Sequence, residues 1–128
     1  MIDANILLDW LLDRDTARTL RIDRLFLTKT KFHVADLAIV EIVFALEKVY
    51  QLPRDIVAMN VSKIIESEHL SCNQILFAPA ISDYVRHPSL SIVDCCLLRY
   101  AELQNNLPLW TFDKKLVNQS AGRAKIIK

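Results

Sequence analysis

Short apolar runs alternate with longer amphipathic segments along the whole chain. In the longer segments apolar residues recur at helical spacing, as Val57, Val61 and Ile64 do. Such alternation is typical of a parallel sheet wrapped by helices, so the chain is expected to be α/β.

The pattern predicts where the elements lie. Helices are expected over residues 6–12, 16–27, 37–50, from Pro53 onward, 75–85, 91–104 and 113–117. Short strands are expected at 33–35, 70–72, 107–112 (buried) and 124–127. Asp36 is expected to cap its helix, Pro53 to fit the first turn of the next, and Pro79 to start or kink a third.

Composition limits the class of protein. A chain of 128 residues, 52% of them hydrophobic, suits one domain over residues 1–128. The three cysteines make no disulfide framework, and neither a secretion signal nor a membrane span is found, so a soluble, cytoplasmic protein is expected. With a net charge of +1, binding to nucleic acid would need a local basic patch or bound cations.

Four acidic residues interrupt or end apolar runs, and they are the candidate site residues. Glu41 lies within residues 37–46 and Asp94 within 92–98, while Asp3 follows Met1 and Ile2 and Asp113 follows 109–112. A buried ionised carboxylate is costly, so such residues need a cation, a proton or hydrogen-bond donors.

Three of these acids also have a structural interpretation. Asp94 follows Ser91 at the spacing of a capping box, Asp113 suits a helix cap, and Asp3 suits a turn with Asn5. Glu41 lies too far into its helix to cap it, which leaves a surface glutamate as the alternative.

The four acids would lie at strand ends or early in helices, where ligands collect in open α/β sheets. All four can therefore converge on one edge. Hard carboxylate oxygens select Mg²⁺ or Mn²⁺, which can activate water and stabilise charge during displacement at phosphorus.

The order of these motifs resembles the PIN-domain family. The match is carried by Asp3-Ala4-Asn5, by Glu41 in its acidic helix, by Ser91-Ile92-Val93-Asp94 and by Thr111-Phe112-Asp113. It covers essentially the whole chain, and it is close to VapC-like toxins and their stand-alone relatives.

The resemblance implies a three-layer α/β/α sandwich with a short, mostly parallel central sheet. It also implies an Mg²⁺- or Mn²⁺-dependent endoribonuclease, the toxin component of a toxin–antitoxin pair, with an antitoxin partner and a homodimeric state. By position, Asp3, Glu41, Asp94 and Asp113 become catalytic metal ligands, supported by Asn5 and Thr111. The alternative is a non-catalytic PIN-fold module that binds RNA or protein.

Two features depart from the family pattern. Only Met1 and Ile2 precede Asp3, so either the first strand is short or the chain begins upstream. Ala4 replaces the usual hydroxyl residue and removes one supporting hydrogen bond.

Basic residues supply candidates for RNA contact. They are Arg14, at the start of a basic stretch that includes Lys29, and Lys114 and Lys115 beside the fourth acid. The alternative is a solvated helix face. Trp10 and Trp110 are expected in the core rather than as base-stacking platforms, and His33, His69 and His87 as structural or surface residues.

Overall fold

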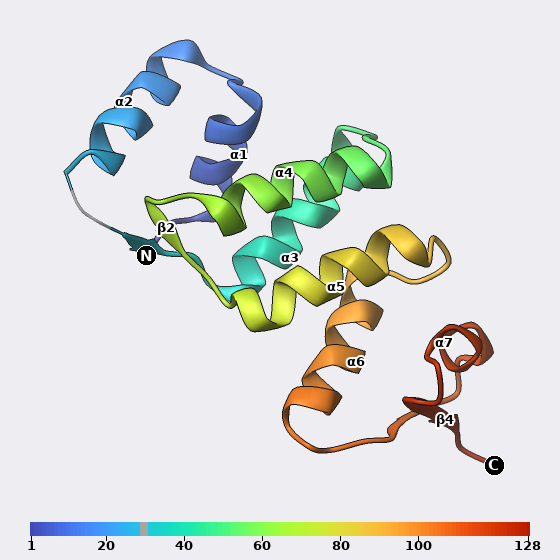
Figure 1. Ribbon diagram of the computed structural model, residues 1–128. Helices are drawn as coiled ribbons and strands as arrows, with labels where there is room; N and C mark the ends of the chain where they lie inside the picture. The colour runs from blue at the N-terminus through green and yellow to red at the C-terminus, as the bar shows by residue number, and fades with distance from the viewer. Residues whose placement is uncertain (29–30) are drawn as a thin grey trace. The chain divides into compact units, whose positions relative to one another are not determined.

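The chain divides into two units, Met1–Asn73 and Gln74–Lys128 (Figure 1). The structure is a computed structural model, and it describes residues 1–28 and 31–128. Each unit combines helices with one pair of short parallel strands.

The first unit opens with a helical hairpin. Helix α1 (Ala4–Leu12) and helix α2 (Thr16–Phe26) lie within two residues of the predicted boundaries, 6–12 and 16–27. Asp13 turns the chain with a left-handed backbone (φ 48°), and the side chain of Asp15 caps α2 by accepting from the Arg18 N–H. The turn chemistry thus fixes where one helix ends and the next begins.

Helix α3 (Asp36–Phe44) forms the centre of this unit's core and continues into a π-helical segment, η1 (Ala45–Val49). Ile39, Ile42 and Leu46 are fully buried. Asp36 was predicted to cap α3, and this was wrong. Ala35 has the extended backbone of the N-cap, and no side chain caps the helix.

A parallel strand pair joins β1 (Phe32–His33) to β2 (Leu70–Ser71), with Phe32 opposite Leu70. The backbone N–H of Ile2 donates to the carbonyl of His33 at 2.9 Å, which draws the residues before α1 alongside β1. Helix α3, segment η1 and helix α4 (Arg54–Glu66) lie between the two strands in the chain. Pro53 is the N-cap of α4 rather than part of its first turn.

The second unit begins with α5 (Gln74–Arg86), which packs on α6 (Ile92–Leu103). Pro79 lies inside α5, so it does not start the helix. Phe77, Tyr84 and Leu98 are fully buried in this unit.

Strand β3 (Leu109–Thr111) and strand β4 (Ala124–Ile126) form the second parallel pair, and α7 (Lys114–Gln119) connects them. A buried strand was predicted over residues 107–112, and the burial was wrong. Leu109 and Thr111 are half-buried, and Trp110 is 59% exposed.

The helices and parallel strands confirm the predicted α/β class. Strands pair within each unit, so the described residues contain two two-stranded sheets. None of the helices in the described part of the chain has the length and apolar character needed to cross a bilayer.

Candidate functional site

Asp3 is the N-cap of α1, and its side chain is exposed. Its Oδ1 accepts a long hydrogen bond, 3.5 Å, from the backbone N–H of Asn5. The turn that the sequence offered as an alternative role is therefore present. The predicted support from Asn5 comes through its backbone, and the second carboxylate oxygen of Asp3 has no partner among the described residues.

Glu41 is exposed, although it was expected to be buried among apolar neighbours. It lies on α3 opposite the buried Ile39 and Ile42, on a stripe shared with Leu37 and Phe44, which are 82% and 41% exposed. No described residue forms a hydrogen bond or an ion pair with its carboxylate. Glu41 therefore has neither a capping role nor a structural partner in the described part of the chain.

Asp94 is half-buried and forms a complete capping box with Ser91. Its Oδ2 accepts from the Ser91 backbone N–H at 3.1 Å, and the Ser91 hydroxyl accepts from the Asp94 N–H at 3.1 Å. The capping interpretation is thus confirmed. It occupies one carboxylate oxygen and leaves Oδ1 uncommitted.

Asp113 caps α7 from an exposed position. One oxygen, Oδ1, accepts from the backbone N–H groups of Lys115 at 2.9 Å and Leu116 at 3.3 Å. The hydroxyl of Thr111 accepts from the Asp113 N–H at 3.0 Å and so orders the turn that holds Asp113.

The four acids are shared equally between the two units: Asp3 and Glu41 in the first, Asp94 and Asp113 in the second. In neither unit do three His, Cys, Asp or Glu side chains of the described residues lie close enough to hold a metal ion. The donor chemistry nevertheless suits a hard cation, because each of the four keeps at least one carboxylate oxygen without a partner among the residues that the structure describes.

The acid that is buried in the first unit is not one of these four. It is Asp9, which is 6% exposed. Its Oδ1 accepts from Arg14 Nε at 2.8 Å, and its Oδ2 lies 3.6 Å from Arg18 Nη1. Arg14 also donates to the Tyr50 hydroxyl at 2.9 Å, and this bond raises the pKa of the Arg14 guanidinium. The Arg14 guanidinium is therefore already bound within the protein, so it is less available for the predicted contact with RNA.

In the second unit the buried acid is Asp83, at 3% exposed. Arg99 donates two hydrogen bonds to Asp83, from Nε to Oδ2 at 2.8 Å and from Nη2 to Oδ1 at 2.9 Å. Arg123 Nη1 lies 3.7 Å from Asp83 Oδ2. The bonds to Asp83 raise the pKa of Arg99. The sequence analysis did not identify Asp83 as a buried acid. The signals were the apolar residues 80 and 81 that precede it and the presence of Arg99 as a possible ion-pair partner.

The remaining candidate lysines and the two tryptophans differ in where the structure places them. Lys114 and Lys115 are exposed and form no ion pair with a described residue, whereas Lys29 lies outside the described residues. Trp10 is half-buried against the edge of Phe26, with ring centroids 5.6 Å apart. The prediction that Trp110 lies in the core was wrong.

Histidines and cysteines have structural surroundings. His69 stacks on Phe26 at 5.8 Å, His87 hydrogen-bonds Gln119 at 2.7 Å, and His33 is exposed. No disulfide joins the cysteines among the described residues, and burial raises the pKa of the half-buried Cys72 thiol. The histidines are therefore consistent with the structural or surface positions expected of them.

Comparison with known protein families gives a match that covers nearly the whole chain. The family model described as PIN domain matches residues 1–121, a range that contains all four acids. Comparison with curated proteins and with solved structures gave no match.

Proposed function

Because the chain belongs to the PIN domain family, we propose that it is an endoribonuclease that hydrolyses RNA phosphodiester bonds with Mg²⁺ or Mn²⁺. PIN domains are generally nucleases. The observation that carries the proposal is that the matched range, residues 1–121, retains the complete ordered set of four acids.

In this proposal Asp3, Glu41, Asp94 and Asp113 hold the metal. The ion would supply an activated water and positive charge at the phosphate under attack. The chain's part is to present carboxylate oxygens in fixed orientations. Caps hold Asp3, Asp94 and Asp113 through one oxygen each, and the other oxygen remains for coordination.

Asn5 and Thr111 are proposed as supporting residues. Thr111 supports Asp113 by accepting its backbone N–H, and Asn5 supports Asp3 through its own N–H. Partners that orient metal ligands typically affect metal affinity or activity by about 10- to 100-fold when removed.

The biological setting is also a proposal. By its likeness to VapC-like toxins, the chain would be the toxin component of a toxin–antitoxin pair in the cytoplasm, a homodimer inhibited by its antitoxin. Both units would belong to one PIN-like domain over residues 1–128, since the matched range runs through both of them.

Cleavage of single-stranded RNA tests the proposal directly. We expect cleavage with Mn²⁺ or Mg²⁺, none with EDTA, and a loss of about 100-fold or more in Glu41→Gln, because the amide lacks the ligand's charge. Glu66→Gln is the matched control, since Glu66 is an exposed helical glutamate outside the proposed site.

If Glu41→Gln cuts RNA as fast as the parent, Glu41 is not a ligand and the proposed site is wrong. If neither protein cuts but both bind RNA, the chain is the non-catalytic binding module instead.

A further inference from the structure

The indole of Trp110 is exposed and lies next to a hollow on the second unit. Trp110 is 59% exposed, and Phe112, two residues later, is 78% exposed. An exposed indole is unusual because burying it would gain more apolar area than burying almost any other side chain. Such a ring on a strand is suited to bind something flat.

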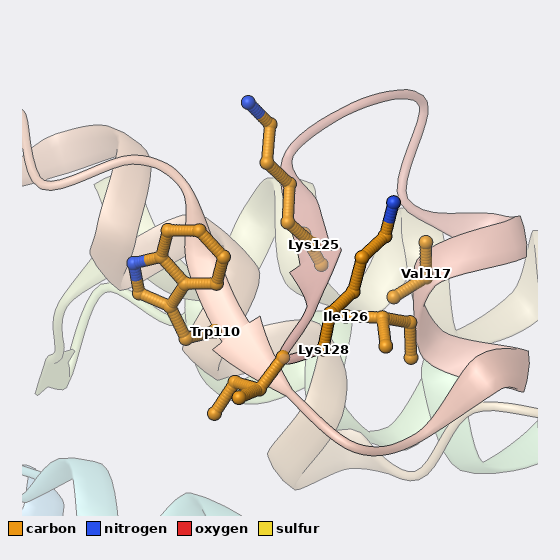
Figure 2. A pocket seen from close by; sticks show the side chains of 7 residues that line it. Trp110, Val117, Lys125, Ile126 and Lys128 are labelled. Atoms are coloured by element: carbon orange, nitrogen blue, oxygen red, sulfur yellow. The ribbon is translucent and has the colours of Figure 1, made fainter.

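The hollow beside Trp110 has a volume of about 780 Å³, within the range of ligand-binding clefts. Trp110, Val117 and residues 124–128 line it. Trp110 and Lys125 are register partners on β3 and β4, so their side chains project from the same face of the strand pair. Figure 2 shows the indole on one side of the hollow, Val117 on the other and Lys125 between them.

The charged side chains that line this hollow have one sign. Lys125 and Lys128 are its only charged side chains, both are exposed, and neither forms an ion pair with a described residue. Their ammonium groups are therefore available to an anionic ligand, and the indole and apolar floor are available to a flat one.

We propose that Trp110 and Lys125 form a stacking platform for single-stranded RNA: the indole stacks on a base while Lys125 and Lys128 neutralise adjacent phosphates. This combination of an aromatic face with nearby cations is how proteins hold single strands without reading sequence. A duplex presents its bases already stacked, so it would not fit the platform.

This proposal rests on the proposed function and deepens it by naming how the substrate is held. Trp110 precedes Asp113 by three residues, which limits the separation of their Cα atoms to about 10 Å. A base stacked on Trp110 would thus belong to a nucleotide close to the phosphate at Asp113.

Tryptophan fluorescence tests the stacking step. The chain has two tryptophans, so Trp10→Phe leaves Trp110 as the only tryptophan. In EDTA, a short single-stranded oligoadenylate should quench its emission, and an RNA duplex of equal length should quench it much less.

Affinity, measured by anisotropy of labelled oligoadenylate in EDTA, tests the contribution of each side chain. Trp110→Ala should weaken binding by about tenfold or more, whereas Trp110→Phe, which keeps an aromatic face, should retain most of the affinity. Lys125→Ala should reduce the slope of log affinity against log salt by about 0.7. Lys63→Ala, an exposed lysine on α4, should leave that slope unchanged.

Three results would overturn the platform. The first is unchanged RNA affinity in Trp110→Ala. The second is a fall of many degrees in the melting temperature of Trp110→Ala, which would mean that the indole is packed in a core. The third is a changed oligomeric state of Trp110→Ala with unchanged RNA affinity, which would mean that the surface binds a second copy of the chain. Glu41→Gln separates this proposal from the nuclease. Binding is measured in EDTA and cleavage with metal, so unchanged cleavage in Glu41→Gln counts against the metal site alone, and unchanged binding in Trp110→Ala counts against the platform alone.

Discussion

Asp9 and Asp83 show what a buried carboxylate requires at the scale of single residues. Each is nearly inaccessible to water, and each is held by arginine through a hydrogen bond of 2.8 Å. Arg99 binds Asp83 in the two-pronged geometry that matches a guanidinium to a carboxylate. Removing one member would leave the other charge without compensation.

Asp83→Ala is therefore expected to lower the free energy of unfolding by about 3 kcal/mol, because it removes the two-pronged acceptor of Arg99 and the buried negative charge beside Arg123. Chemical denaturation measures the loss. Glu102→Ala is the control: Glu102 contacts the same arginines from a more exposed position, at 33% of its side chain, and its removal should cost less than about 1 kcal/mol. Equal losses in the two variants would contradict the role assigned to the buried pair.

The same rule applies to acids that the sequence analysis did not single out and fails for one that it did. An acid inside an apolar run was expected to be buried and to need a partner, and Asp9 and Asp83 obey this rule with arginine as the partner. Glu41 does not, because Leu37 and Phe44 share its face of α3 and are themselves exposed. Hydrophobicity along a helix does not reveal which face meets solvent when all faces are apolar.

At the scale of elements, local chemistry predicted the helices well. Periodicity located α1 and α2 to within two residues, and the Ser91–Asp94 spacing predicted the start of α6. Strand burial was predicted less well. The apolar run at residues 107–112 contains only a three-residue strand with an exposed centre, because burial depends on what covers a strand and not on its own residues.

Ser91→Ala tests the capping box as a structural element. It should lower the free energy of unfolding by about 1 kcal/mol, since the N–H of Asp94 loses its acceptor. Ser82→Ala, an exposed position inside α5, should be neutral or slightly stabilising because alanine is the better helix former. Thermal unfolding followed by circular dichroism compares the two, and an equal effect would show that the cap contributes nothing.

At the scale of the whole molecule, the proposed ligands are spread along the sequence from residue 3 to residue 113. Each unit supplies two of the four acids, and each acid is fixed by its own helix rather than by another acid. Local sequence could predict the acids and their caps, but not a metal site, which depends on the arrangement of the complete chain. Metal binding is therefore the property that tests the four acids together.

A shared metal site predicts a specific thermal response. An ion present at about 100 times its dissociation constant stabilises the folded chain by about 2.7 kcal/mol, so Mg²⁺ or Mn²⁺ should raise the melting temperature by several degrees. NaCl of matched ionic strength should not reproduce this shift, because screening weakens repulsion between acids without coordinating them.

Asp94→Asn separates coordination from capping within this response. The amide oxygen of asparagine can still accept the Ser91 N–H, so the metal-free variant should be as stable as the parent or more so. Without the carboxylate charge, its melting temperature should no longer respond to Mg²⁺ or Mn²⁺ beyond the effect of NaCl. An identical metal response in the variant and the parent would mean that Asp94 only caps α6, and the proposed ligand set would lose one of its four members.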